Sequence, residues 1–472
     1  MKKQLDFLSD KFKNSFDVKK REIETALGPA TLMFTDTLCS TQFISEYIIK
    51  PLTIVMDGIK TEDDIIKRVL NINSADYVKD DNDAILHVLS GDVVIIFHDK
   101  EKSIFCEVKG YIRRSVSIPV TEAGLKGPRE GFTEAFVDNV TLIRRRVKNA
   151  ALKFEAIYVG KETQTVVTLT YIEGVAPKEI VDSVRKTLKT LDYNFVLDSN
   201  YIEAKLRAKR TLFDTVGYTE KADDATAKIL EGRVAVIVDG TPFVITVPSY
   251  FIENFQVPDD FYLNRYFATF TRTLRWIAFF IALFLPGLYV AVTTHHFSVL
   301  PTTFIFRLAV SRVGVPFPTI AEVLIIMFLF QLIKEAGLRL PQPIGTSMSL
   351  VASFVLGSSA VAAGVASTIT IIVVCIAAVC YFLIPRLYAA VSLWSFVVAI
   401  FGALYGFPGI IFIGLIILAH LSNLYTCEHP YLFPVGTLGE HKFQDLLSRG
   451  SLEKISGHIV KEVHEKNGKS KK

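Results

Sequence analysis

Residues 315–345 read VPFPTIAEVLIIMFLFQLIKEAGLRLPQPIG and predict a helix that is bounded at both ends. The boundary residues are Pro316 and Pro318 before the apolar run, and Gly337, Pro341 and Pro343 after it. This spacing leaves room for about five helical turns. The uncharged centre, residues 323–333, is too short to cross a bilayer unaided, and it is typical of an interfacial, re-entrant or protein-buried helix.

The charged residues of this stretch lie only near its ends. Glu322 falls in the first turn and Lys334 in the last, where the helix dipole favours each sign of charge. That placement alone accounts for both residues. Ionisable groups near a membrane core are nevertheless costly and are usually retained for use. Glu322, Glu335 and Arg339 are therefore also candidates for a gate-lever helix, meaning a helix whose movement opens a pathway.

The chain has 472 residues, half of them apolar, and the apolar residues are unevenly distributed. Up to about residue 255, charged and apolar residues are mixed as in a soluble protein, whereas residues 274–425 contain several long apolar runs. The predicted fold is an α/β soluble N-terminal region of two lobes followed by an all-α polytopic membrane domain. The start of the chain has no apolar core of signal-peptide length, so we expect the soluble region in the cytosol.

Composition and local patterns predict five parts of the chain. We expect a first cytosolic α/β lobe at residues 1–118, a connecting helix or linker at 119–149, a second cytosolic α/β lobe at 150–255, a helical transmembrane domain at 256–428 and a basic C-terminal tail at 429–472.

Within the lobes, two strand pairs stand out. Residues 92–97 and 103–108 predict a hairpin joined across HDKEK. In RVAVIVDGTPFVITVP, two strand-like runs flank Asp239 and Gly240, which favour a two-residue hairpin turn. Pro177 fits the first position of a helix that precedes this second pair.

The segment between the lobes, residues 126–149, carries opposite charges at close spacing and ends in a basic cluster at Arg144, Arg145 and Arg146. It is a candidate site for an anion or a partner. A solvated helix face with internal ion pairs is the commoner explanation of such a pattern.

Residues 345–366, GTSMSLVASFVLGSSAVAAGVA, are dominated by small side chains. Ser353 and Gly357 are four residues apart, as are Ala360 and Gly364, so helices can approach closely along this face. Close packing is one interpretation. The other is a narrow ion or water pathway, which needs a wall with little bulk and some polarity. The candidate pore-lining or gating residues are Ser353, Gly357, Ser358, Val361 and Gly364.

The number of membrane crossings stays open in the sequence. Residues 274–292 predict a first span, with a kink at Pro286 and Gly287. Counting only strong apolar runs gives five spans, but the basic tail favours an even number, and we expect six crossings or half-crossings.

Polar residues flank the first span on both sides. Asp259 and Asp260 are candidates for capping a short helix. The residues that suit a headgroup boundary are Tyr262, Tyr266, Arg272, Arg275 and Trp276. After the span, the adjacent His295 and His296 predict an exit loop rather than a metal site, because further ligands are missing nearby.

Several functional classes find no support in the sequence. The first half has no Walker loop, no GxGxxG after a strand, no HExxH and no GxSxG. Basic residues are scattered, which argues against nucleic-acid binding. We expect no catalytic residues, no metal and no cofactor. A channel or receptor subunit, a secondary transporter and a membrane-embedded enzyme subunit remain as alternatives.

Seven motifs together resemble the A subunit of the bacterial spore germinant receptors, the GerA family. They are KGPREGFTEAFVDNVTLIRRR, GRVAVIVDGTPFVITVP, VPDDFYLNRYFATFTRTLR, LPGLYVA, RVGVPFPTIAE, IKEAGLRLPQPIG and VLGSSAVAAG, in family order from Lys126 to Gly364. The VPFP and EAGLRLP blocks are the most specific.

The resemblance implies a multi-pass protein of the spore inner membrane whose N-terminal domain faces the spore core. It implies a transporter-like B subunit and a lipoprotein C subunit as partners. It also implies a homo-oligomeric ring of A subunits that forms an ion channel, opened when nutrient binds, and that releases monovalent cations to start germination. The chain departs from the usual family pattern at Gln331, Lys334, Ser358 and Ser359.

Overall fold

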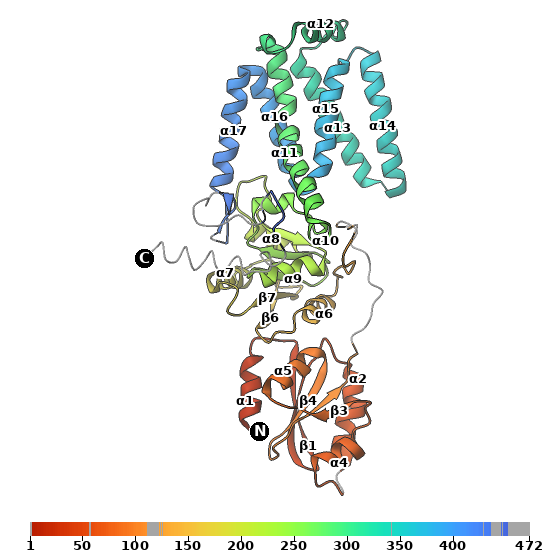
Figure 1. Ribbon diagram of the computed structural model, residues 1–472, viewed down its shortest axis with the longest axis vertical. Coiled ribbons are helices and arrows are strands. Elements are labelled where there is room, and N and C mark those ends of the chain that lie inside the picture. Colours follow the sequence, from red (N-terminus) through yellow and green to blue (C-terminus); the bar gives the residue numbers. More distant parts are fainter. Residues whose placement is uncertain are drawn as a thin grey trace, which may run out of the picture.

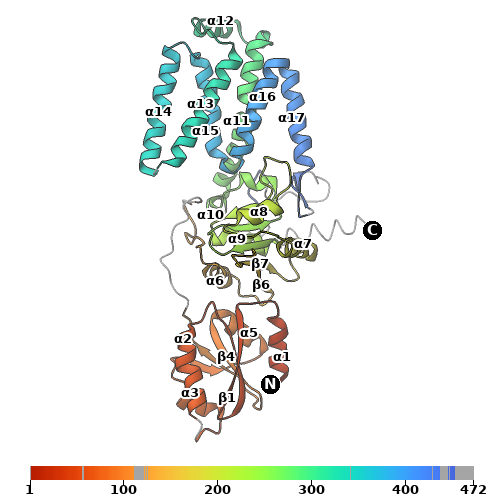
Figure 2. The ribbon, with the colours of Figure 1, turned by 180° about the vertical axis from the view of Figure 1, so that it is seen from behind.

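The structure is a computed structural model that describes residues 2–55, 58–110, 122, 124, 126–340, 342–427, 429–435, 445 and 447–451. Two lobes and a helical bundle follow one another along the long axis of the molecule (Figure 1, Figure 2). The predicted order, a β-sheet N-terminal region followed by a helical C-terminal region, is confirmed.

Among the described residues, the first lobe contains a five-stranded antiparallel sheet in the order β1-β2-β4-β5-β3. Its strands are β1 (Val18–Thr25), β2 (Gly28–Thr35), β3 (Ala75–Tyr77), β4 (Asp92–Phe97) and β5 (Ile104–Glu107). Its helices are α1 (Lys2–Lys11), α2 (Thr41–Phe43), α3 (Lys50–Ile54), α4 (Glu62–Asp64) and α5 (Asp81–Ser90), with π-helical turns at Ile44–Ile49 and Ile65–Val69. The predicted hairpin is confirmed, because Asp92 pairs with Glu107.

The described part of the second lobe repeats this design with the order β6-β7-β9-β10-β8. Its strands are β6 (Leu152–Val159), β7 (Thr165–Ile172), β8 (Gly217–Thr219), β9 (Val234–Val238) and β10 (Val244–Val247). Its helices are α6 (Phe136–Arg146), α7 (Lys178–Lys189), α8 (Asn200–Leu206) and α9 (Ala222–Leu230), and a 3-10 helix follows at Phe251–Phe255. Pro177 is the N-cap of α7 and precedes its first helical residue.

Both sheets are buried on both faces, which explains why their central strands are continuously apolar. Along β9, Val236 packs into the core under α7 and α8, whereas Ile237 packs into the core under α6 and α9. Alternate residues of β4 are divided in the same way between two cores. Each lobe is therefore a sheet between two helical layers.

The hairpin of β9 and β10 is present, but its predicted two-residue turn is wrong. Val247 pairs with Val234, so the connection runs through residues 239–243. The longer loop anchors the start of α6, because the Asp239 carboxylate accepts from the Phe136 N–H and Gly240 N–H donates to the Glu134 carbonyl. Gly240 has a φ of 91°, which favours glycine.

The basic end of α6 is an internal structural element. Arg144 is 0% exposed, and its guanidinium holds the carboxylate of Asp17, which is also 0% exposed, with hydrogen bonds of 2.8 and 3.0 Å. Arg146 donates to Glu130. Internal ion pairing is thus confirmed, while a solvated face is wrong for Arg144, because the first lobe covers it.

The bundle begins at α10 (Asp259–Tyr262). Its other helices are α11 (Arg265–Thr294), α12 (Thr302–Ser311), α13 (Thr319–Arg339), α14 (Gln342–Ala362), α15 (Thr368–Leu383), α16 (Tyr388–Tyr405) and α17 (Phe407–Ser422), with 3-10 turns at Phe297–Val299 and Pro385–Leu387. Six of the described helices, α11 and α13 to α17, run lengthwise, while α12 lies across the end away from the lobes (Figure 1). Among the described residues, two helices are long and apolar enough to cross a membrane, Arg265–Thr294 and Pro385–Tyr405.

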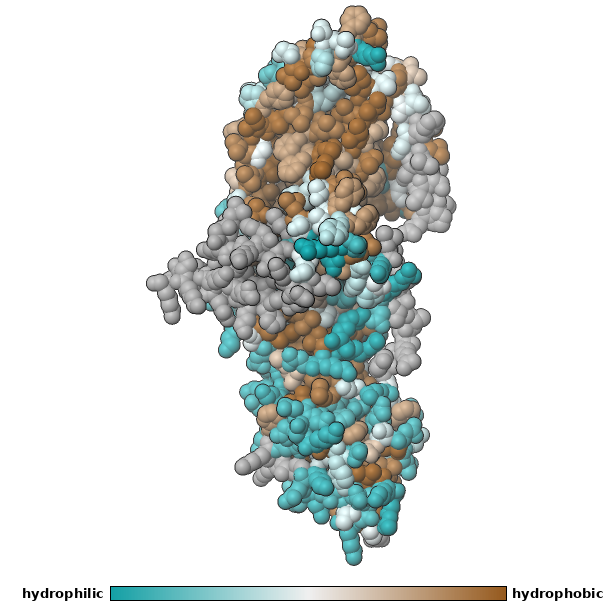
Figure 3. Space-filling view, viewed as in Figure 1, coloured by the Kyte–Doolittle hydropathy of each residue, from teal (hydrophilic) through white to brown (hydrophobic). Residues whose placement is uncertain are grey.

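The surface changes character between the lobes and the bundle. In the view of Figure 3, hydrophobic residues cover most of the described bundle, whereas hydrophilic residues dominate the lobes. An outward-facing apolar surface is what a helical bundle needs in order to contact lipid.

The helix predicted at residues 315–345 begins after Pro318 and ends at Arg339. Gly337 lies inside α13, and Pro343 lies in the first turn of α14, so neither ends the helix. α13 packs on α11, α14, α15 and α16. Of the interpretations that its sequence allowed, protein-buried fits the first half of α13, where Glu322, Val323 and Met327 are buried.

Helices α11 and α16 touch backbone to backbone. A Cβ built on Gly287 would lie 2.7 Å from Val398 Cγ1, and one built on Gly402 would lie 2.7 Å from the Gly287 carbonyl oxygen. Pro286 precedes this contact inside α11. Any larger side chain at Gly402 would push the two helices apart.

The residues predicted as an exit loop after α11 make specific contacts. A ring nitrogen of His295 lies 2.7 Å from the Ala403 carbonyl oxygen, and the His296 ring stacks on Phe407 at 4.6 Å. Both histidines therefore hold the turn between α16 and α17. No group of three or more metal-ligating side chains occurs among the described residues.

The described start of the predicted C-terminal tail, residues 429–435, is packed rather than solvated. β12 (His429–Pro430) pairs with β11 (Tyr425–Thr426), and Tyr431 is 0% exposed against Phe251. This segment lies on the side of the bundle that faces the lobes (Figure 1). The basic residues at the very end of the tail, Lys469, Lys471 and Lys472, lie outside the described residues.

Candidate functional site

The most buried candidate from the sequence, Glu322, organises the end of the bundle away from the lobes. Its side chain is 0% exposed. One carboxylate oxygen accepts from the Ser367 N–H and the Thr370 hydroxyl, both at 2.9 Å, and the other lies 3.1 Å from an Arg312 nitrogen. Tyr289 of α11 adds a hydroxyl 3.1 Å from that of Thr370.

This carboxylate lies at the N-terminus of α15, where Ser367 is the N-cap residue. A negative charge there is favourable, because the first N–H groups of a helix lack partners and carry partial positive charge. Glu322 therefore joins α13 to α15 and to the segment after α12. The sequence explained Glu322 by the dipole at the start of its own helix, α13. The contacts with α15 and Arg312 are a further reason for its position.

The other two residues of the predicted gate lever lie at the opposite end of α13. Arg339 donates to Glu335 at 2.6 and 2.8 Å, and both side chains are exposed, by 79% and 59%. Thirteen residues of helix separate Glu322 from Glu335, or about 20 Å along the axis. The three candidates do not form one site.

Near that second end, α13 also contacts α16. The Tyr388 hydroxyl donates to Gln331, and Lys334 lies over the Tyr388 ring. The sequence singled out Gln331 and Lys334 only as departures from the pattern of the family that it resembles. Their partner, Tyr388, was not identified from the sequence, because nothing in its local pattern marks it.

The small-residue candidates fall into two groups. Ser353, Ser358 and Val361 are exposed on α14, and a Cβ built on Gly357 would meet no atom within 4 Å. Gly364 lies beyond the end of α14, in a turn with a φ of 67°, where a Cβ would lie 2.9 Å from the Gly314 carbonyl oxygen. The predicted helix thus ends before residue 366. Gly364 lies in the connection between α14 and α15, where its backbone passes close to that of Gly314.

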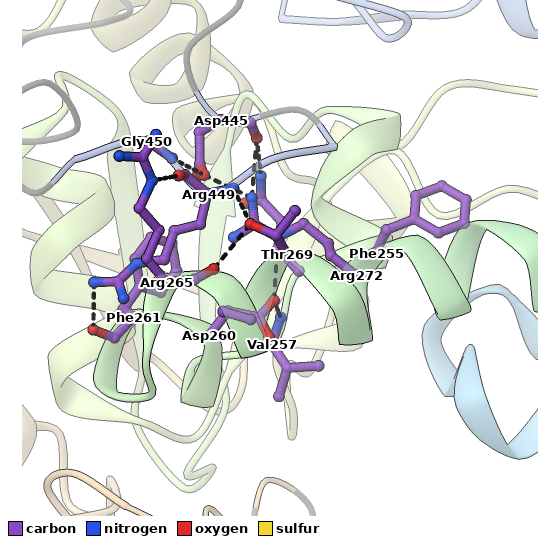
Figure 4. A network of polar contacts seen from close by, with 12 residues as sticks. Phe255, Val257, Asp260, Phe261, Arg265, Thr269, Arg272, Asp445, Arg449 and Gly450 are labelled. Carbon is purple, nitrogen blue, oxygen red and sulfur yellow. Dashed lines mark hydrogen bonds and ion pairs between the residues drawn. The ribbon is translucent and has the colours of Figure 1, made fainter.

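A second polar network lies at the start of the bundle and is centred on Asp260 of α10 (Figure 4). It reaches the second lobe through Arg275, which donates to the Phe255 carbonyl at 2.8 Å. The Asp260 carboxylate is 0% exposed and accepts two hydrogen bonds from Arg275, at 2.7 and 2.9 Å, and one from Arg272 at 3.3 Å. It also accepts from the Val257 N–H. The expected headgroup role is therefore wrong for Arg272, which is 0% exposed, because Asp260 neutralises it within the protein.

Residues near the end of the described chain complete this network. Arg272 donates to Asp445 at 2.6 Å. Arg449 donates to the carbonyls of Leu263 and Phe261, while its own carbonyl accepts from Arg265 (Figure 4). Burial raises the pKa of the Asp445 carboxyl, although Arg272 opposes this. The C-terminal segment thus fastens the first turns of α11, a contact that no local sequence signal indicates.

Further contacts dock the second lobe against the bundle. Arg386, between α15 and α16, donates to Glu122 at 2.6 Å. The Thr426 hydroxyl donates to the Thr215 carbonyl at 2.7 Å, and Trp276 stacks on Phe255 at 3.8 Å. The second lobe thus contacts the bundle at three places: α11, the α15–α16 turn and the strand after α17. We call this interface the joint.

Two half-buried acidic residues, Glu203 and Asp214, lie close to the same joint. Burial and the nearby Asp214 raise the pKa of Glu203, and burial raises the pKa of Asp214 against the effect of its ion-pair partner Arg207. Ionising Glu203 therefore costs the folded state free energy.

We expect Glu203→Gln to raise the thermal midpoint of the full chain at about pH 8 and to leave it nearly unchanged at about pH 4.5. The folded-state pKa lies above the ordinary value of 4.5, so the cost of ionisation appears only as the pH rises above that value. Thermal unfolding at both pH values measures the difference. An equal shift at both values, or a loss of stability at pH 8, would contradict this assignment.

Sequence comparison decides the family. A model of the family described as Bacillus/Clostridium GerA spore germination protein matches residues 6–458. The chain belongs to the GerA family. Among GerA relatives, spore germination protein KA of Bacillus subtilis is 34% identical over 86% of this chain and 76% of that protein. Spore germination protein A1 of Bacillus subtilis is 31% identical over 84% of this chain and 83% of that protein.

Two further similarities complete the comparison. The uncharacterized membrane protein YfkQ of Bacillus subtilis is 32% identical over 89% of this chain and 82% of that protein. The N-terminal domain of the A subunit of the Bacillus megaterium spore germinant receptor GerK3 aligns with a TM-score of 0.41 at 26% identity, covering 52% of this chain and 94% of that chain. The GerA assignment rests on the sequence matches alone.

Proposed function

We propose that this GerA protein is the A subunit of a nutrient-responsive spore germinant receptor, in which copies of the helical bundle surround a gated ion pathway. Family membership over nearly the whole chain carries the receptor role. The exposed small and hydroxyl side chains of α14 support the pathway.

The position of α14 is the structural basis for the pathway. Among the described helices, it packs against α13 and lies at the outer edge of the bundle (Figure 1, Figure 2). Ser353 and Ser358 are exposed, and Gly357 leaves space beside the helix. Helices that meet through small side chains approach closely. A second copy of the chain could therefore pack on α14 and enclose a narrow, weakly polar pathway.

The two ends of α13 suit a gate-lever helix. Glu322 fixes the far end through its ion pair and its contacts with α15. The near end, with the exposed pair of Glu335 and Arg339, leads directly into α14. We propose that movement of the near end shifts α14, and that the joint with the second lobe transmits the state of partner subunits.

The surrounding assignments belong to the same proposal. The chain is a non-catalytic, multi-pass subunit of the spore inner membrane, with six crossings or half-crossings and the lobes in the spore core. Its parts divide near residues 118, 149, 255 and 428. Its partners are a transporter-like B subunit, a lipoprotein C subunit and further A subunits, and the ions released are monovalent cations.

The test is cation flux from liposomes that contain the full chain with its partner subunits. Val361→Ala should increase potassium efflux without nutrient, because it removes bulk from the proposed pathway face. Val355→Ala is the matched control, since position 355 lies about 160° around α14 from Gly357, whereas position 361 lies about 40° away. Both side chains are exposed, Val361 by 38% and Val355 by 49%.

A substitution that adds bulk to the pathway face tests the same proposal, because it should reduce the efflux. Gly357→Leu should fit the single chain, because open space surrounds this position, but should abolish the efflux. Ser359→Leu, on the opposite face, should conduct normally. Equal flux in all four variants, or no flux in an assembled complex, would refute the pathway. Flux that requires a second, coupled solute would favour the transporter alternative.

A further inference from the structure

A cavity of about 340 Å³ lies where the second lobe meets the bundle. Among the described residues, its lining includes Glu122, Tyr218 and Lys221 from the lobe side, Asp259 at the start of α10, and Leu383 and Arg386 from the end of α15 and the turn that follows. Its size is that of a small-molecule site. It is separate from α14 and from the Glu322 network.

Lys221 is the unusual residue of this cavity. Its side chain is 2% exposed, and its ammonium makes no hydrogen bond in the part of the chain that the structure describes. A carboxylate oxygen of Asp223 lies 3.8 Å from this ammonium and already accepts from the Tyr262 hydroxyl. Burying an ammonium without hydrogen bonds is costly, so such a group is retained where something compensates it.

The acidic groups of the cavity are already occupied. Glu122 accepts from the Thr219 hydroxyl, the Glu220 N–H and Arg386. Asp259 accepts from the Lys126 N–H. Arg386, in contrast, uses one of its five N–H donors to bond another described residue, Glu122. The N–H groups of Lys221 and Arg386 can therefore donate hydrogen bonds to a ligand that is rich in acceptors.

We propose that this cavity binds a phosphate group through Lys221 and Arg386. Arginine and lysine are the side chains that recognise phosphate, by charge-assisted hydrogen bonds. The cavity lies at the end of α15 and α16 that faces the lobes, which is the level of lipid headgroups if the bundle spans a membrane. The phosphate comes either from an anionic lipid or from solution, and the chemistry of the site is the same.

The first test measures thermal unfolding of the full chain in detergent, with inorganic phosphate or with chloride at equal ionic strength. Phosphate well above its Kd should raise the midpoint by about 3 °C or more. Lys221→Met should abolish this rise. Because the variant also removes a buried ammonium that makes no hydrogen bond to a described residue, its midpoint without phosphate should equal or exceed that of the unaltered chain.

Lys153→Met is the matched control. Lys153 is a lysine of the same lobe whose side chain is 3% exposed, but it donates a hydrogen bond to the Lys11 carbonyl. Its replacement should lower the midpoint and leave the phosphate response intact. A Lys221→Met chain that is less stable than the unaltered chain, or that responds to phosphate as strongly, would overturn the proposal.

The second test identifies the source of the phosphate. The chain is placed in nanodiscs of phosphatidylcholine, whose choline offsets the phosphate charge, with or without phosphatidylglycerol. If a headgroup occupies the site, phosphatidylglycerol raises the midpoint of the unaltered chain and of Lys153→Met but not that of Lys221→Met. If free phosphate occupies it, only inorganic phosphate does so. No response to either probe would refute the site, whatever the outcome of the flux experiments.

Discussion

Asp260→Ala should loosen the start of α11 and lower hydrogen-exchange protection there by about two to three orders of magnitude. The variant leaves the 0%-exposed Arg272 and the largely buried Arg275 without their shared carboxylate. Removing one partner of a buried ion pair costs roughly 3–5 kcal/mol, because the remaining charge stays buried without compensation. Hydrogen exchange reports this locally, which suits a chain of several folding units.

Asp192→Ala provides the control for this result. Asp192 also forms an ion pair, with Lys161 of the same lobe, but its side chain is 79% exposed. Exposed pairs contribute about 0–1 kcal/mol. Protection in residues 265–275 should be unchanged in Asp192→Ala. Comparable protection of these residues in both variants would show that Asp260 does not hold the joint.

Glu322→Ala should destabilise the end of the bundle away from the lobes by roughly 3–5 kcal/mol, since it removes the partner of Arg312 and the acceptor of two hydrogen bonds at the start of α15. Glu322→Gln should cost less, about 1–3 kcal/mol, because an amide oxygen can still accept from Ser367 and Thr370. Exchange protection of the first turn of α15 in nanodiscs measures both effects.

Glu335→Ala is the control for Glu322→Ala, because it removes an exposed glutamate rather than a buried one from the same helix. Its pair with Arg339 is exposed, so the loss should be at most about 0.5 kcal/mol. If Glu322→Ala left exchange protection intact and abolished only the germination response, Glu322 would act in gating without holding the helices together. The structural role assigned to Glu322 would then be wrong.

Local sequence patterns predicted the elements of this chain much better than its polar contacts. The run at residues 92–97 is continuously apolar because both faces of β4 are covered, and such a run indicates a buried strand. Pro318 fixed the start of α13 because proline restricts the backbone before a helix. The turn at Asp239 was predicted too short, since its contacts with α6 come from a distant part of the chain.

The polar partners could not be predicted for the same physical reason. Glu322 was identified as a candidate, but its pairing with Ser367 joins residues 45 positions apart. Arg272 was assigned to the headgroup boundary because the sequence does not show that Asp260, on the preceding short helix, turns toward it. The apolar segment that forms α12 was also missed, since its ten residues are too few for a distinct pattern.

The position of Arg449 has a consequence for biosynthesis. Its carbonyl accepts from Arg265, and the two residues are 184 positions apart in the chain. A ribosome therefore completes both lobes and every lengthwise helix before it makes the C-terminal residues that fasten the first turns of α11. During that interval the nascent chain carries Arg272 without Asp445, so this contact forms late, and chains that terminate before Asp445 would lack it.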